Sequence, residues 1–150
     1  MYYKRILYLS ENHPDPDVEG LSLKRDYIIP RYANTPIYSE PSFDYVMIKT
    51  TENMMAKRGG SLYVSTNRFW HAGERISYYT YVVSVVDQIV QRVYIADTWF
   101  KLSDGNSAGR WGFFGREAKG EEFDRLIGKR IPEQYRVPGN ASPVLYKKYF

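Results

Sequence analysis

The strongest pattern of apolar positions in this chain covers residues 78–86, where tyrosine, threonine and valine follow one another almost without a break. Aromatic and β-branched side chains in such a run favour a pleated strand over a helix. Alternation places Tyr81 and Val83 on one face of this strand and Val82 and Val86 on the other. Because both faces are apolar, we expect this strand to lie in the centre of a sheet.

Weaker patterns predict an α+β fold with more strand than helix. Further strands are expected at residues 3–9, 43–50, 62–64, 89–100 and 143–146, with a short helix as the alternative for 43–50. A helix is expected over residues 51–57, ended by Gly59 and Gly60, and residues 121–127 are expected to form a brief helix or a strand end. No repeat, low-complexity segment or linker interrupts the chain, so residues 1–150 are predicted to form a single domain.

Two long stretches show neither the alternation of a strand nor the periodicity of a helix and are expected to be loops. Residues 27–41 contain three prolines and scattered tyrosine and asparagine, which indicates an irregular but ordered connection. Residues 101–115 are rich in glycine and contain Trp111, Phe113 and Phe114. We expect these three side chains to be exposed aromatics on a loop.

Composition excludes several classes of protein. Cysteine is absent, so disulfides and thiolate chemistry are excluded. No run approaches the roughly 18 apolar residues of a membrane span, and the apolar run at the start of the chain is too short for a signal-peptide core. Localisation therefore stays open between the cytoplasm and delivery as a secreted effector. The net charge of +4 and the 15 tyrosines suit an anionic partner and stacking on bases, although such a charge also serves solubility alone.

Metal chemistry is not indicated by the sequence. The two histidines, His13 and His71, lie far apart and show no spacing of a metal site. Asp15, Asp17 and Glu19 lie near His13, but a solvated acidic loop explains them better than a site for a hard cation.

Three short segments carry the candidate chemistry when they are taken together. They are residues 8–18 (Tyr-Leu-Ser-Glu-Asn-His-Pro-Asp-Pro-Asp-Val), residues 63–67 (Tyr-Val-Ser-Thr-Asn), and Glu-Phe-Asp at 122–124 followed by Arg-Ile-Pro-Glu at 130–133. Their order and spacing resemble those of the ADP-ribosyltransferases of the cholera and pertussis toxin type. In that family a first strand carries Tyr-Arg-x-Asp-x-Arg before prolines. A Tyr-Val-Ser-Thr-Ser segment then precedes an aromatic strand, and a Glu-x-Glu or Gln-x-Glu pair lies before an Ile-Pro turn.

The resemblance implies a split β-sheet core with few short helices and an NAD-dependent mono-ADP-ribosyltransferase of toxin or effector type. NAD would be a substrate, and the acceptor a macromolecule, with protein favoured over nucleic acid. Asp124, seven residues before Ile131, takes the place of the catalytic glutamate and would stabilise positive charge on the ribose as nicotinamide leaves. Glu122 would orient the acceptor or a ribose hydroxyl. Ser65 and Thr66 would contribute to NAD binding, Thr66 mainly by bracing the neighbouring strands.

Other site residues follow from the same resemblance. Trp111, Phe113 and Phe114 lie where the family has its target-recognition loop and would contact the acceptor. His13 falls where the family has its second arginine, and Arg5 is the nearest cation on the first strand. Both are therefore candidates for binding NAD.

The chain departs from the family pattern at positions that matter for activity. Leu9 stands where the family has an arginine that binds NAD, and Arg5 lies about 13 Å away at 3.3 Å per strand residue. Asp124 is one methylene shorter than the catalytic glutamate. A displacement of about 1 Å can reduce a rate roughly a hundredfold.

These departures leave two alternatives open. One is a catalytically degenerate protein of the same fold that binds a protein or a nucleotide. The other is a small basic nucleic-acid-binding protein, whose support is the charge and the aromatic content. Under either alternative residues 65–67 form a strand end with a helix cap, and Glu121, Glu122 and Asp124 form a solvated face. Trp111, Phe113 and Phe114 would then form a core plug under a loop.

Overall fold

One long strand, β4 (Ile89–Leu102), joins most of the sheet. The structure is a computed structural model that describes residues 6–10, 26–136 and 142–148. β3 (Tyr81–Val86) pairs antiparallel with the first half of β4, and β5 (Trp111–Glu117) pairs antiparallel with its second half. β1 (Leu7–Leu9) runs parallel to the last three residues of β4.

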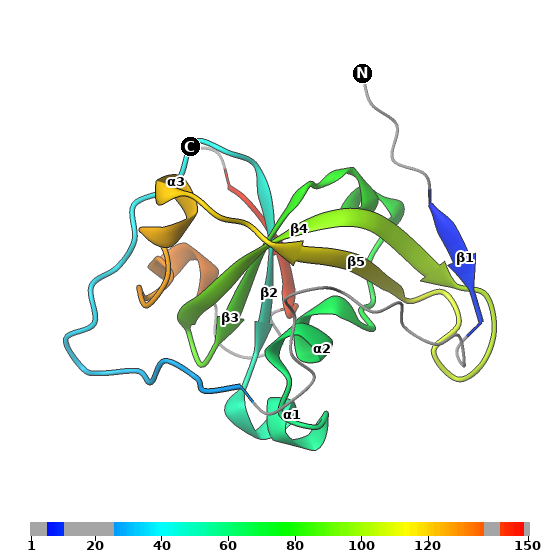
Figure 1. The fold of residues 1–150 in the computed structure, drawn as a ribbon, viewed down its shortest axis with the longest axis horizontal. Coiled ribbons are helices and arrows are strands. Elements are labelled where there is room, and N and C mark those ends of the chain that lie inside the picture. The colour runs from blue at the N-terminus through cyan, green and yellow to red at the C-terminus, as the bar shows by residue number, and fades with distance from the viewer. Residues whose placement is uncertain (1–5, 11–25, 137–141, 149–150) are drawn as a thin grey trace.

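The remaining strands extend the sheet beyond β3. β2 (Tyr45–Thr50) lies parallel to β3, and β6 (Val144–Tyr146) pairs antiparallel with β2. The strand order is β1-β4-β3-β2-β6, with β5 on β4 beside this path, as Figure 1 shows. β3 thus has a neighbour on each edge and is buried on both faces, which confirms the prediction of a central strand, although the strand begins at Tyr81 and not at Tyr78.

Among the described residues, three short α-helices accompany a mixed sheet of six strands, and the predicted α+β class is confirmed. They are α1 (Glu52–Lys57), α2 (Leu62–Asn67) and α3 (Glu121–Asp124). Two short 3-10 turns, η1 (Glu74–Tyr78) and η2 (Glu133–Tyr135), complete the helical structure. No helix in the described ranges is long and apolar enough to cross a membrane.

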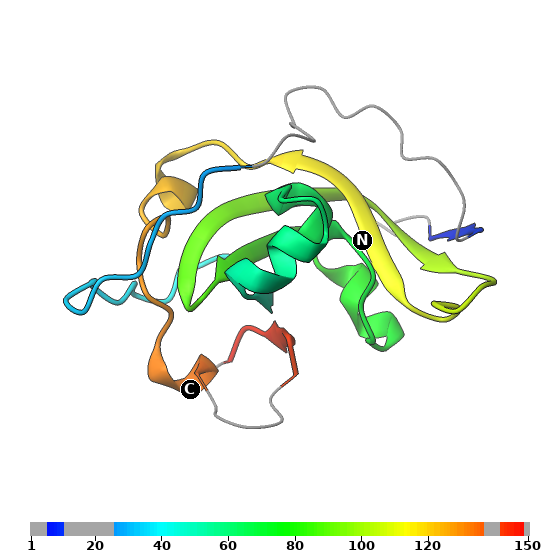
Figure 2. The same cartoon turned by 90° about the horizontal axis from the view of Figure 1, so that it is seen from below.

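The two faces of the sheet carry separate cores. On one face Met47 and Val83 pack with Phe123 of α3, and we call this the α3-side core. On the other face Val82 packs with Tyr63 of α2, which defines the α2-side core. Figure 2 shows the curved β4–β5 pair, with α1 and α2 lying apart from α3. Each fully buried large side chain contributes on the order of 2 kcal/mol, so both helices are held mainly by these contacts.

The predicted helix over residues 51–57 is confirmed as α1. The Thr51 side chain accepts a hydrogen bond from the Met54 N–H at 3.2 Å and thereby caps the helix. Gly59 and Gly60 adopt φ values of 90° and 82°, which explains why glycine follows the helix. The predicted strands at 43–50, 89–100 and 143–146 are confirmed as β2, β4 and β6.

The predicted strand at residues 62–64 is wrong, because these residues begin α2. The Ser61 hydroxyl accepts a hydrogen bond from the Val64 N–H at 3.2 Å, and Asp26 Oδ2 accepts one from the Leu62 N–H at 2.6 Å. Two backbone donors at the start of the helix are therefore satisfied by side chains, one of them from a distant segment. Capping and the burial of Tyr63 override the local β propensity.

The predicted loop at residues 101–115 is also wrong at both ends, because β4 continues to Leu102 and β5 begins at Trp111. Glycine is needed in β5 for close packing and does not mark a loop. A Cβ atom on Gly115 would lie 1.9 Å from the Ile95 carbonyl oxygen, and one on Gly112 would lie 2.3 Å from the Phe100 ring.

A network of buried tyrosines stabilises the α3-side core. The Tyr45 hydroxyl donates to Glu40 Oε1 at 2.5 Å, the Tyr38 and Tyr45 hydroxyls lie 2.8 Å apart, and the Tyr135 hydroxyl donates to Glu40 Oε2 at 3.1 Å. Burial raises the pKa of both Tyr38 and Tyr45 well above the ordinary value of 10.0. The folded protein therefore keeps these phenols protonated.

The tyrosine network predicts alkaline instability. Above pH 10 the unfolded chain loses phenolic protons that the folded chain keeps, so the free energy of unfolding falls as pH rises, and below pH 10 the contribution is fully present. In Tyr45→Phe the decline between pH 10 and 11 should be smaller by about 1 kcal/mol, measured by urea unfolding. Tyr27→Phe is the control, because Tyr27 is 97% exposed. Equal declines in Tyr45→Phe and the wild type would contradict this account.

Candidate functional site

Of the four predicted NAD-binding residues, the structure describes Ser65 and Thr66, and both are buried in α2. Arg5 and His13 lie outside the described residues. Thr66 is buried in α2, where its hydroxyl lies 2.8 Å from the Leu62 carbonyl oxygen and 2.8 Å from the Ser84 hydroxyl. It therefore ties α2 to β3. Ser65 is fully buried, and its hydroxyl has no hydrogen-bond partner in the part of the chain that the structure describes.

The predicted catalytic pair lies elsewhere. Glu122 and Asp124 belong to the short helix α3, which is the helical one of the two forms expected for residues 121–127. Both side chains are exposed, and only Phe123 between them is buried. Because α3 packs on the α3-side core and α2 on the α2-side core, the structure does not bring Asp124 together with Ser65.

The predicted acceptor-recognition residues belong to β5 and are not exposed loop aromatics. Trp111 is 2% exposed and Phe113 is fully buried in the α2-side core. Phe114 is half-buried, and its ring centroid lies 4.8 Å from that of Phe100. The expectation of exposed aromatics is wrong for Trp111 and Phe113, because β5 directs them into the α2-side core, whereas the Phe114 side chain remains partly exposed.

Sequence reasoning missed a group of cations that the fold gathers around two tryptophans. Trp70 and Trp111 form an isolated bridge, with N–H···O distances of 2.8 Å in both directions. Arg58 at the end of α1, Lys101 in β4 and Arg110 directly before β5 lie around this bridge, and we call these three residues the basic surface. They come from separate elements, so the sequence contains no run of basic residues that would indicate this surface.

Arg58 is the best-held member of the basic surface. Its Nη1 donates to the carbonyl oxygen of Arg68, the C-cap of α2, at 2.7 Å and to that of Ser65, in the last turn of α2, at 3.3 Å. Its guanidinium carbon lies 4.9 Å from the centroid of the Trp70 ring. Burial lowers the pKa of Arg58, and the charge of Arg110 lowers it further. The two guanidinium groups are therefore close enough to repel each other.

Lys101 extends the basic surface along the sheet. Its ammonium nitrogen lies 5.8 Å from the centroid of the Trp111 ring. Across the β1–β4 pairing its register partner is Tyr8, which is 66% exposed. Within the described part of the chain, no carboxylate forms an ion pair with Arg58, Lys101 or Arg110. The surface thus combines uncompensated positive charge with an exposed aromatic ring.

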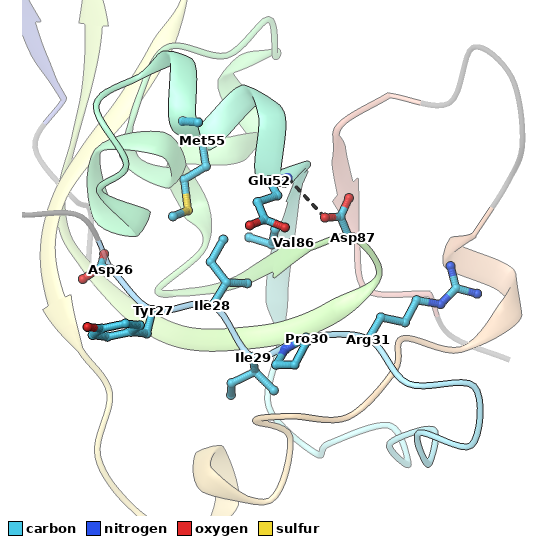
Figure 3. Close-up of a pocket in the computed structure, with 11 residues that line it drawn as sticks. Asp26, Tyr27, Ile28, Ile29, Pro30, Arg31, Glu52, Met55, Val86 and Asp87 are labelled. Carbon is cyan, nitrogen blue, oxygen red and sulfur yellow. Dashed lines mark hydrogen bonds between the residues drawn. The ribbon is translucent and has the colours of Figure 1, made fainter.

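A pocket of about 670 Å³ lies between α1 and residues 26–31 (Figure 3). Its apolar lining includes Ile28, Met55 and Val86, which also form a small hydrophobic cluster. Glu52 and Asp87 lie at its rim, where Asp87 Oδ2 accepts a hydrogen bond from the Glu52 N–H at 3.2 Å.

The first pocket includes Val86, at the end of β3, and a second hollow of about 440 Å³ lies at the start of this strand. It is lined by Asp44, Arg75 and residues 78–81, and Tyr78 is 71% exposed. The Arg75 guanidinium carbon lies 4.0 Å from the centroid of the Tyr146 ring, so this arginine is stacked and held. Trp99 donates its indole N–H to the Tyr79 carbonyl oxygen at 2.8 Å beside this hollow.

Neither a metal site nor a similar known protein gives further evidence about function. Within the described ranges, no group of three or more histidine, aspartate or glutamate residues is placed to hold a metal ion. Comparison with models of protein families, with curated proteins and with solved structures finds no significant match. Functional inference therefore depends on the residues themselves.

The contrast between Ser65 and Thr66 predicts opposite effects on stability. Ser65→Ala removes a buried hydroxyl without a partner and should raise the free energy of unfolding by about 1 kcal/mol. Thr66→Val keeps the shape but removes the hydrogen bond to Ser84, and should lower the free energy of unfolding by about 1–2 kcal/mol. Urea unfolding of both variants measures the difference. Destabilisation by Ser65→Ala would contradict this description of the helix.

Proposed function

We propose that this chain is a module that binds single-stranded nucleic acid through the basic surface. The observation that carries the proposal is the gathering of Arg58, Lys101 and Arg110 without an ion-pair partner among the described residues. The arrangement places Arg58 and Arg110 close enough for the charge of one to lower the pKa of the other. A bound phosphate would offset this repulsion and is therefore favoured at this surface.

The geometry of the surface favours a flexible polyanion over an isolated ion. The cations come from three elements, the end of α1, β4 and the residue before β5, and gather around Trp70 and Trp111, so they suit successive phosphates of one backbone. Tyr8 faces solvent beside Lys101 and offers a ring on which an unpaired base can stack. Stacking of this kind requires single-stranded nucleic acid, because bases in a duplex are already stacked.

The NAD-dependent ADP-ribosyltransferase of toxin or effector type, with its split-sheet core, stays a prediction of the sequence resemblance. Its support is the order of the three motifs and not the position of the candidate residues, since Ser65 and Asp124 lie on different faces of the sheet. NAD also carries phosphates, so the basic surface is compatible with nucleotide binding without turnover.

Turnover of labelled NAD by the protein and by Asp124→Ala tests the transferase prediction. If the chain is a binding module, neither protein should release nicotinamide or become modified. Nicotinamide release by the wild type that is lost in Asp124→Ala would instead support the transferase.

Binding of a fluorescein-labelled oligodeoxythymidine of about ten nucleotides, followed by fluorescence anisotropy, tests the proposed function. Affinity should fall with salt, with a slope of about −0.7 in log K against log salt for each phosphate contact. The double variant Lys101→Ala with Arg110→Ala should bind roughly tenfold more weakly and show a slope smaller by about 1.4.

The matched control is Arg125→Ala with Lys129→Ala, which removes the same charge at and beyond the end of α3. This control should bind like the wild type, because α3 packs on the opposite face of the sheet from α2. A flat salt response, or equal losses in the two double variants, would exclude the basic surface as the binding site.

A further inference from the structure

The pocket between α1 and residues 26–31 has a chemistry opposite to that of the basic surface. We propose that it binds a basic segment of a partner protein, with a lysine or arginine side chain beside Glu52 and Asp87. Neither the binding of nucleic acid nor the predicted transferase uses this pocket.

Charge complementarity identifies the occupant as cationic. Three carboxylates line the pocket, those of Asp26, Glu52 and Asp87, against one cation, Arg31. This local excess of negative charge stands out in a chain whose net charge is +4. A positively charged segment is thus attracted to the pocket and repelled by the basic surface.

The three carboxylates are not equally available. Asp26 accepts the hydrogen bond from Leu62 N–H at the start of α2, and Asp87 accepts the one from Glu52 N–H at the start of α1. The Glu52 carboxylate makes no hydrogen bond or ion pair with a described residue, and Figure 3 shows it pointing from α1 toward Ile28. Glu52 therefore makes the direct contact to the incoming cation, and Asp87 adds charge beside it.

The floor of the pocket suits the stem of a long basic side chain. The half-buried Ile28 offers apolar surface beside Glu52, and it packs on Met55 and Val86, which are themselves buried. Lysine and arginine bury their methylene groups on apolar surface while their charged ends remain near water or a carboxylate. A small hydrophilic cation would leave this floor uncovered.

The size and surroundings of the pocket favour a peptide over a single side chain. Its volume of about 670 Å³ is far larger than one lysine and lies within the range of well-formed ligand sites. Tyr27 lines the pocket and is 97% exposed, so it offers a rigid aromatic contact of the kind that is enriched at protein interfaces. Neighbouring residues of the same peptide can use this ring.

The two charged sites are kept apart by the length of α1. Glu52 begins this helix and Arg58 follows its last residue, which separates them by about 9 Å along the axis. The arrangement also matches the helix dipole, which favours acidic residues at the first turn and basic ones at the last. A basic segment that enters the pocket is thereby directed away from the basic surface.

Methyl NMR of the full chain, labelled at the methionine methyl groups, tests the proposal directly. The probe is a short peptide that alternates lysine and leucine. The Met55 signal should shift on titration, because Met55 lines the pocket, and the Met47 signal should not, because Met47 is buried in the α3-side core. Peptides that alternate lysine with serine, or glutamate with leucine, should bind at least roughly fivefold more weakly.

The test variant combines Glu52→Gln with Asp87→Asn. The control variant combines Glu121→Gln with Glu133→Gln and removes the same two negative charges outside the pocket. The first pair should weaken binding of the lysine–leucine peptide roughly fivefold to tenfold, and the control should leave it unchanged. Equal affinity in both pairs, or a shift confined to Met47 or Met54, would overturn the proposal. Spermidine shifting Met55 as effectively as the peptide would also overturn it, since a small amine would then be the preferred occupant.

Discussion

The pairing of β4 with neighbours on both of its edges is the constraint on which the rest of this fold depends. β3 and β1 occupy successive parts of one edge, and β5 occupies the other. A strand of 14 residues can do this only if it bends, and the pairing shifts register between Ala96 and Thr98. Close approach of β5 to β4 then requires glycine at Gly115. The same pairing sets Lys101 opposite Trp111, so the basic surface is a product of strand register.

The central strand β3 divides the molecule into two independent halves. Its alternating side chains supply a core on each face, and each core holds its own short helix. This division explains why α2 and α3 do not share a site, although their residues follow the order of a toxin-type motif. The acidic pocket and the basic surface are instead connected by α1, which begins with Glu52 and is followed by Arg58.

Regular elements with strong local signals could be predicted, and features that depend on distant residues could not. The valine-rich strand β3 and the helix α1, capped by Thr51, follow from periodicity and capping alone. The helix α2 depends on Asp26, which lies 36 positions before the Leu62 N–H that it caps. The glycines of β5, Gly112 and Gly115, resemble a loop signal in the sequence, but they are needed because β4 packs too closely for a Cβ atom. The basic surface joins three separate elements, so no single stretch of sequence reveals it.

The central claim is that nucleic acid binds where Trp70, three residues beyond α2, forms a bridge with Trp111 at the start of β5. The most direct measurement follows the three indole N–H signals of the protein by NMR while oligodeoxythymidine is added. The signals of Trp70 and Trp111 should move together, and that of Trp99 should stay in place because it donates to the Tyr79 carbonyl oxygen beside the second hollow. Movement of the Trp99 signal alone, or of none of the three, would contradict the claim.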